Sequence, residues 1–434
     1  MLPTYELAYA LASGSLSLFV GTGFSKHLTD GKAPDWQTLL QRCCRTLRSS
    51  EGLFEELFPD GRAIMPLEEC ASVISLQMIK EGKSLYVEIA AEVKKLKVNP
   101  MIAKPLQDFA LKHATLKFIT TNYDHLIEDG ILKGRCTSFA PGSPISRQRI
   151  HHEIFHIHGS YKLAEQMVVT ADDYYAFINS PNYFSKKLDS LLEENTTIII
   201  GYSLGDINFK SILNAHRYSG ARSINRQHLF YLSRAKIAQH VKDYYDASYG
   251  LRVIDETSIL ELIKAIDEKY DLIEPSVKKS KDLLQSVLDG KEIYKDAYFK
   301  QDESFSEILA TISSTGLRVE SANVIKLFET LIQRKLEFTQ ESGAFLQYDH
   351  LAGWLIRLGC VMDLDGTPLK EVYLSAVKSS FRTMSRKKEK GYSWAAYSTW
   401  KNNWGQLTYK NRVMLRKYVN DHSIKGDCES VVNQ

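Results

Sequence analysis

The chain has 434 residues, of which 44% are hydrophobic and 25% charged, and its net charge is +3. This length predicts two domains, and the composition is that of a globular protein large enough to bury a sizeable core. The small net charge argues against a nucleic-acid partner for the chain as a whole. No apolar run approaches the about 20 residues that span a bilayer. Residues 1–20 read as a helix and a strand rather than as a signal peptide.

Six short runs rich in β-branched and aromatic residues predict strands. They are residues 16–20, 116–121, 154–158, 196–201, 228–233 and 251–255. Several are almost continuously apolar, as the buried strands of a parallel sheet are. Segments with apolar residues at helical spacing separate them, for example 185–194 and 258–273. Strands that alternate with helices predict an α/β fold with a Rossmann-like parallel sheet.

Two regions lack a strand signal and read as helical. Residues 37–112 predict a helical insertion within a sheet domain that covers residues 1–275. A proline and a charge run near 273–282 mark a boundary, and the pattern from 283 to 434 is helical. We therefore expect a second, α-helical C-terminal domain that serves assembly or partner binding.

The cysteines carry no recognisable metal or redox motif. None of the six forms a CxxC pair, which argues against a zinc ribbon and a thioredoxin-like site. We expect free or packed thiols in a reducing, cytoplasmic setting. The cysteines are Cys43, Cys44, Cys70, Cys136, Cys360 and Cys428.

The first candidate motif is FVGTGFS, residues 19–25, where a predicted strand runs into two glycines. Gly21 and Gly23 allow a tight turn and a close approach of the backbone to a phosphate, and a helix that starts there would offer N–H groups to it. The full GxGxxG fingerprint is absent. Taken alone, the motif is explained as well by a plain strand-to-helix turn.

The second motif is FITTNYDHLIE, residues 118–128, and the fourth is TTIIIGYSLGDINF, residues 196–209. Each sets polar residues just after a predicted strand, where open α/β sheets bind their ligands. Asn122 or Asp124 could instead cap the next helix, and Asp206 could be an ordinary loop residue. The four motifs together predict one polar edge of one sheet.

The third motif is IHHEIFHIHG, residues 150–159, with four histidines in eight residues. On a strand, His156 and His158 would share one face, and His158 would end the strand just before Gly159. Imidazole is a common metal ligand. Since no cysteine pair and no carboxylate except Glu153 lies nearby in sequence, we expect no metal site here.

GTGFS, APDW at 33–36, TTNYD, the His158–Gly159 pair and GYSLGD stand in the order found in the sirtuin family. The chain most resembles the sirtuin-like NAD-consuming domains of bacterial antiphage defence, over about residues 12–255. The resemblance implies an NAD glycohydrolase that releases nicotinamide and ADP-ribose and depletes NAD. An NAD-dependent protein deacylase, an ADP-ribosyl transferase and a non-catalytic NAD- or ADP-ribose-binding regulatory module stay open as alternatives.

By the same resemblance, the catalytic residues are Asn122, which lies against the nicotinamide ribose and positions water, and His158, which contacts the ribose hydroxyls. A histidine with a pKa near its ordinary value of about 6.5 suits the role of a base. The four-cysteine zinc module of protein-deacetylating sirtuins is missing, which favours hydrolysis of NAD. The implied NAD-binding residues are Gly21, Thr22, Gly23, Ser25, Asp35, Trp36, Asp124, Gly201, Ser203 and Asp206.

Residues 378–417 are basic and interleaved with aromatic residues. They could bind nucleic acid through phosphate contacts and stacking. We favour the alternative that Trp394, Tyr397 and Trp404 form one helical face that is buried in the core or in an interface. Because an uncontrolled NAD hydrolase would kill its host, the resemblance also implies control by homo-oligomerisation or by a partner such as a HerA-like translocase. We expect no membrane partner.

Overall fold

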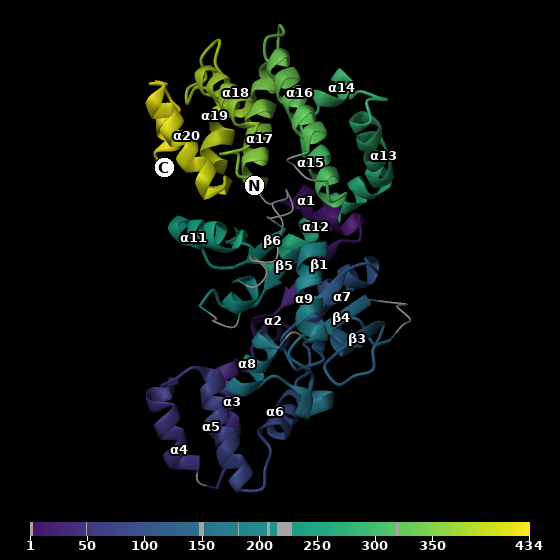
Figure 1. Ribbon diagram of the computed structural model, residues 1–434, viewed down its shortest axis with the longest axis vertical. Coiled ribbons are helices and arrows are strands. Elements are labelled where there is room, and N and C mark those ends of the chain that lie inside the picture. Colours follow the sequence, from purple (N-terminus) through teal and green to yellow (C-terminus); the bar gives the residue numbers. More distant parts are fainter. Residues whose placement is uncertain are drawn as a thin grey trace.

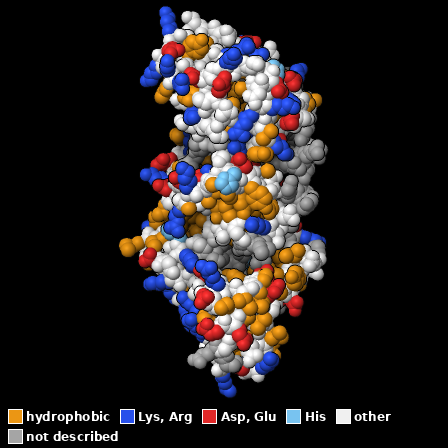
Figure 2. Space-filling model, turned by 90° about the vertical axis from the view of Figure 1, so that its left-hand side faces the viewer, with side chains coloured by type: hydrophobic (Ala, Val, Ile, Leu, Met, Phe, Trp, Pro, Cys, Tyr) orange, Lys and Arg blue, Asp and Glu red, His pale blue; other side chains and the backbone are white. Residues whose placement is uncertain are grey.

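The computed structural model describes residues 3–48, 50–146, 152–180, 182–205, 209–214, 228–317 and 321–434. Three tiers follow one another along the long axis (Figure 1). Helices of the 36–94 region form one end, a sheet with flanking helices forms the middle, and the C-terminal helices form the other end. Basic and acidic side chains are interspersed over the face seen in Figure 2, in keeping with the small net charge.

A seven-stranded parallel sheet forms the middle tier, in the order β3-β4-β2-β1-β5-β6-β7. Its strands are β1 (Leu16–Val20), β2 (Lys117–Thr120), β3 (Cys136–Phe139), β4 (His152–His156), β5 (Thr196–Ile200), β6 (Leu229–Leu232) and β7 (Leu251–Ile254). The predicted Rossmann-like parallel sheet is confirmed, and β4 lies two residues earlier than expected. The sequence did not reveal β3, because this edge strand has only one buried residue and no apolar run.

The strands are apolar on both sides because helices cover both faces of the sheet. On one face, Leu18, Phe118 and Ile198 share a core with α1 (Thr4–Ala12), α7 (Pro100–Lys112) and α12 (Ile259–Ile273). On the other face, the neighbouring residues Phe19, Ile119 and Ile199 share a core with α8 (Ala171–Asn179), α9 (Tyr183–Glu194) and α11 (Gln239–Tyr249). Because successive side chains of a strand point to opposite faces of the sheet, the strands contribute to two separate cores.

The segment between β1 and β2 is helical throughout its described part. Before α7 it comprises α2 (Thr22–Leu28), α3 (Trp36–Cys44), α4 (Ser50–Leu57), α5 (Leu67–Lys80) and α6 (Leu85–Lys94). A short helical turn, Pro59–Gly61, lies between α4 and α5. Helices α3 to α6 enclose a core of their own, and Tyr123 and Val169 reach into it from the sheet tier. All six cysteines are free thiols, and Cys43, Cys44 and Cys70 lie in this core.

The C-terminal tier is helical in its described residues, apart from one isolated β-bridge between Met384 and Ser393, and is built around one core that contains Trp354, Trp400 and Trp404. Its helices are α13 (Val277–Leu288), α14 (Asp296–Phe299), α15 (Ser304–Ser314), α16 (Ala322–Phe338), α17 (Phe345–Val361), α18 (Lys370–Thr383), α19 (Trp394–Asn403), α20 (Tyr409–Asp421) and α21 (Glu429–Val432). This tier is tied to the sheet tier, because buried Arg412 forms an ion pair with Asp243. Within the described ranges, no helix is both long enough and apolar enough to cross a bilayer.

The basic aromatic region is only partly buried as expected. Trp404 is 2% exposed, but Trp394 is 45% exposed, and the Lys388 ammonium lies 5.0 Å from its ring centroid. Trp394 therefore does not lie in the core of this chain, and burial of Trp394 in an interface stays a prediction. The buried residues of α19 are Ala396, Trp400 and Asn403, at helical spacing, and Trp394 does not fall on that face. Nucleic-acid binding by this region stays the open, less favoured alternative.

Lys335 on α16 is a fully buried amine in the C-terminal core. Its Nζ donates to the Phe299 carbonyl (2.9 Å) and to Gln347 Oε1 (2.8 Å) and lies 4.4 Å from the Trp354 ring centroid. Burial lowers the pKa of Lys335 from 10.5 to about 7. Between these two values the unfolded chain binds more protons than the folded chain, so the free energy of unfolding rises with pH.

We expect the free energy of unfolding of the C-terminal tier to rise by roughly 2 kcal/mol between about pH 7 and pH 9. Replacing Lys335 with methionine should remove that rise. Denaturant unfolding of both proteins at the two pH values measures the difference. An equal pH dependence in wild type and variant would show that the amine does not titrate in this window.

Candidate active site

The carboxyl ends of four strands lie level with one another in the middle of the sheet. Val20 pairs with Thr120 on one side and with Ile200 on the other, and Thr120 pairs with His156. The order of strands also reverses at β1. Strands β2, β4 and β3 lie on one side of β1, and strands β5, β6 and β7 lie on the other side. Such a reversal opens a crevice at the carboxyl edge, where α/β proteins bind ligands. The structure therefore brings the four motifs to this edge.

Two glycine loops contact each other backbone to backbone at the reversal. The Gly23 N–H donates to the Gly201 carbonyl (2.9 Å), and the Gly21 N–H donates to the Ile200 carbonyl (2.9 Å). A Cβ atom on Gly23 would lie 2.9 Å from the Gly201 Cα, and one on Gly201 would lie 2.3 Å from the Phe24 nitrogen. Gly201 also has φ +78°, which favours glycine. Close packing of the loops thus explains why glycine stands at both positions.

A chain of side-chain hydrogen bonds joins the first two motifs. Asn122 Nδ2 donates to Ser25 Oγ (2.9 Å), and Ser25 Oγ donates to Asp124 Oδ2 (2.7 Å). The other carboxylate oxygen of Asp124 accepts from the Leu126 N–H (3.1 Å) and so closes a local turn, but no side chain caps the helix Ile127–Ile131 that follows. Burial raises the pKa of Asp124. Asn122 is only partly buried, which leaves it within reach of a ligand.

His158 lies in the turn after β4, not on the strand. Its ring packs edge-on against Tyr174 (5.2 Å between centroids) and Phe177 (5.1 Å), on the face of α8. The expectation that His158 shares a strand face with His156 is wrong, because the strand ends at His156 and the chain turns through Gly159 at φ +90°. Burial lowers the pKa of His158 to about 4, well below the expected value.

Asp35 and Trp36 begin α3 beside the TTNYD loop. Asp35 Oδ1 accepts from the Thr38 N–H (2.8 Å), and Oδ2 pairs with Lys26 Nζ (2.7 Å). Burial opposes ionisation, but these two partners lower the pKa of Asp35 to about 2. The Trp36 ring meets Tyr123 edge-on at 6.0 Å. These contacts attach the helical insertion to the candidate site.

The remaining predicted residues are less closely connected. Thr22 is the first residue of α2, and Ser203 Oγ accepts from the Gly205 N–H (3.1 Å) within its own loop. Asp206 lies outside the described residues, as does His151. Sequence reasoning missed Tyr202, whose hydroxyl is 2.8 Å from Thr121 Oγ1 and so bridges the loops after β5 and β2.

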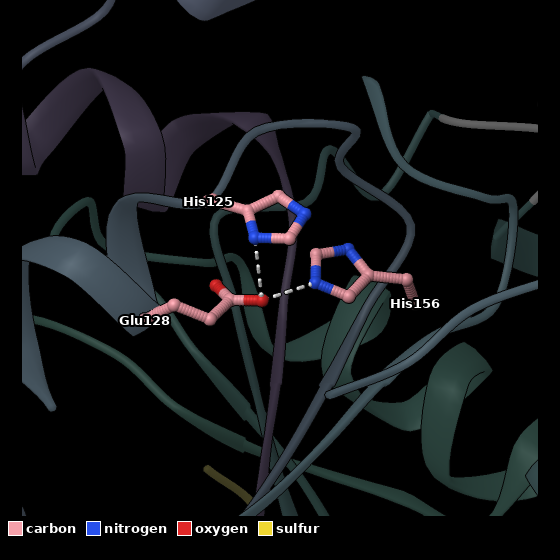
Figure 3. Close-up of side chains that lie close together, drawn as sticks. All are labelled: His125, Glu128 and His156. Carbon is pink, nitrogen blue, oxygen red and sulfur yellow. Dashed lines mark hydrogen bonds and ion pairs between the residues drawn. The ribbon is translucent and has the colours of Figure 1, made fainter. Parts of the chain in front are cut away.

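A buried cluster under the edge was also missed (Figure 3). His156 Nε2 lies 2.7 Å from Glu128 Oε1, and His125 Nδ1 lies 3.2 Å from the same oxygen. Burial opposes the charged forms, but the mutual attraction lowers the pKa of Glu128 to about 2 and raises that of His156. His152, in contrast, turns to the Leu116 carbonyl (3.0 Å). The H-x-x-E spacing at 125–128 was the available signal.

The DDYY segment at 172–175 has a structural role. Thr170 and Asp173 form a capping box at the start of α8, and Tyr86 from α6 donates to Asp173 Oδ2 (2.7 Å). Tyr174 is the residue that packs on His158. This segment therefore fixes α8 against His158.

Comparison with known proteins finds similarity that includes the sheet tier. Residues 116–254 match the family model of the SIR2-like domain. The chain is 27% identical over 314 residues to the defense-associated sirtuin 2 of Bacillus subtilis, covering 71% of this chain and 28% of that protein. It is also 27% identical over 181 residues to the NAD(+) hydrolase ThsA of Cytobacillus dafuensis, covering 39% of this chain and 35% of that protein.

The chain spans about a third or less of the length of these curated relatives. One of these relatives is named a sirtuin, and the other is named an NAD(+) hydrolase. The matched range of the family model covers strands β2 to β7. The parallel sheet, the motifs on its carboxyl edge and these matches make the sheet tier of this chain similar to SIR2-like domains, and residues 116–254 carry the match.

Proposed function

We propose that the SIR2-like domain cleaves NAD at the bond between nicotinamide and ribose, releasing nicotinamide and ADP-ribose, and that it serves antiphage defence by depleting NAD. The observation that carries the proposal is the hydrogen-bonded chain Asn122–Ser25–Asp124 at the reversal of strand order. The likeness to an NAD(+) hydrolase and to a defense-associated sirtuin supports it.

The reaction needs few groups. Nicotinamide leaves a cationic pyridinium as a neutral molecule, so it needs no strong acid, and the ribose passes through an oxocarbenium-like state. Ser25 holds the amide of Asn122 in one orientation, so that Asn122 can position the attacking water. His158, with its low pKa, is neutral at physiological pH and a weaker base than expected. It suits the acceptance of a hydrogen bond from a ribose hydroxyl better than full proton removal.

The described arrangement fits a resting state. The His158 side chain is only 4% exposed, and Tyr174 and Phe177 on α8 pack against its ring. Substrate can meet this ring only after α8 or its side chains shift. We therefore propose that NAD cleavage is suppressed until a trigger moves α8.

The cysteines argue against the deacylase alternative. Cys43, Cys44 and Cys70 are free thiols packed inside the insertion core, and burial raises the pKa of each. Cys136 is on β3 in another part of the domain. A structural zinc site needs four ligands gathered around one point. Among the described residues no group of cysteines is placed in this way, so these residues do not replace the four-cysteine module of deacetylating sirtuins. The C-terminal tier is our candidate for homo-oligomer contacts or for a HerA-like partner.

The test is release of nicotinamide from NAD by the full chain in a cytoplasmic-type buffer, alone and after expression in phage-infected cells. We expect little release alone and rapid loss of NAD after infection. An acetyl-lysine peptide is the control substrate. Nicotinamide release that depends on this peptide, with no hydrolysis in infected cells, would overturn the proposal in favour of deacylation.

A further inference from the structure

We propose that His125, Glu128 and His156 form a binding site for one divalent transition-metal ion of the zinc class, beneath the Asn122 loop. The three side chains come from two different motifs, and their ligand atoms all lie within 4.8 Å of one another. In Figure 3 one ring nitrogen of each histidine points toward the same oxygen of Glu128. Two imidazoles and one carboxylate are a donor set that suits zinc.

The outward-facing nitrogens of both histidines are already occupied by the protein. His156 Nδ1 lies 3.2 Å from the Asn122 carbonyl, and His125 Nε2 lies 2.6 Å from Ser160 Oγ. This arrangement fixes each ring and directs its second nitrogen toward Glu128. Metal-binding histidines usually have such an outer hydrogen bond, because it sets the ring orientation and the tautomer.

The inward-facing atoms are not fully satisfied. His125 Nδ1 and Glu128 Oε2 are buried and have no hydrogen-bond partner among the described residues, and the two side chains are only 6% and 5% exposed. Unsatisfied buried polar atoms are costly, so a ligand that they share would stabilise the fold. A bound cation would also compensate the buried carboxylate.

The distances fit an ion with a small adjustment. Ligands at about 2.0–2.1 Å around a tetrahedral zinc lie roughly 3.3 Å apart. The distance from His125 Nδ1 to Glu128 Oε1 is already 3.2 Å. The distance from His156 Nε2 to the same oxygen is 2.7 Å and has to widen by about half an ångström, or the carboxylate has to present Oε2 instead.

An ion here would hold the candidate active site in shape. His125 belongs to the loop that carries Asn122 and Asp124, and His156 contacts the Asn122 carbonyl from the end of β4. Glu128 lies in the five-residue π-helix Ile127–Ile131, a rare element that often marks functional sites. The metal would therefore link β4 to the catalytic loop without touching NAD itself.

The test measures metal directly and does not depend on NAD cleavage. The full chain is stripped with a chelator, loaded with Zn²⁺ or Co²⁺, dialysed and analysed for bound metal. We expect about one ion per chain and the intense visible absorption of tetrahedral cobalt. Glu128→Gln, which keeps the shape of the side chain, should weaken binding at least about 100-fold.

His152→Gln is the matched control, because this buried histidine lies on the same strand but turns to the Leu116 carbonyl. It should bind metal as the wild type does. If the wild type binds no ion and shows no tetrahedral cobalt spectrum, the cluster is only a hydrogen-bonded ion pair and the proposal is wrong. The cobalt spectrum of the wild type decides this even if a variant fails to fold.

Discussion

Replacing Asn122 with alanine is expected to lower the rate of NAD cleavage at least about 100-fold, because even a small misplacement of water and ribose is costly to turnover. The amide group of Asn122 is held by Ser25 and the residue is only partly buried. The substitution should therefore leave the fold intact. Nicotinamide release by the activated protein measures the effect.

Two further measurements separate catalysis from simple binding. Asn420→Ala changes an exposed asparagine on α20 in the C-terminal tier and should cleave NAD at the wild-type rate. Calorimetric titration with NAD shows whether the Asn122 variant still binds the dinucleotide. If the wild type binds NAD but does not cleave it under any activating condition, the domain is a regulatory binding module instead.

Replacing Gly201 with alanine is expected to destabilise the SIR2-like domain by about 3 kcal/mol or more. The new Cβ would lie 2.3 Å from the Phe24 nitrogen and 2.9 Å from the Gly23 carbonyl carbon. Both are backbone atoms, so neither can move aside as a flexible side chain would. The φ of +78° adds strain for any residue with a Cβ. The loops after β1 and β5 would have to separate, so NAD binding should fall with stability.

Gly205→Ala in the same loop is the matched control. Among the described residues, its Cβ would meet only Ser203 Oγ, at 3.4 Å. We expect a change within about 0.5 kcal/mol, as for most surface substitutions. Denaturant unfolding followed by a probe in the sheet domain compares the two variants. Equal stability of both would mean that the contact between the two glycine loops is looser than described.

Much of the fold follows from local sequence pattern. The runs LSLFV and TTIII are short, largely apolar and rich in β-branched or aromatic residues, which is typical of strands covered on both faces, and they form the fully buried strands β1 and β5. Glycines and polar residues directly after such runs indicated the carboxyl edge. The short, polar strand β3 could not be predicted from the sequence, because it lies at the sheet edge beside β4 and has no alternation of apolar and polar residues.

The histidine motif shows where local pattern stops being informative. From IHHEIFHIHG alone, a four-histidine site and a shared face for His156 and His158 were reasonable ideas. In the folded chain His156 meets His125 and Glu128 from another motif, while His158 turns away toward α8. Partners distant in sequence are set by the register of β2 against β4, which aligns Thr120 with His156.

The sequence by itself determined the parallel α/β sheet, the helical C-terminal region and the order of motifs typical of sirtuins, since apolar periodicity and strand-end glycines are local properties. Only the tertiary structure decided which side chains touch. It joined Asn122 to Ser25, set Gly23 against Gly201 and buried His158 under Tyr174. These contacts depend on strand register and helix packing, which bring together residues up to about 180 positions apart and leave no trace in any short stretch of sequence.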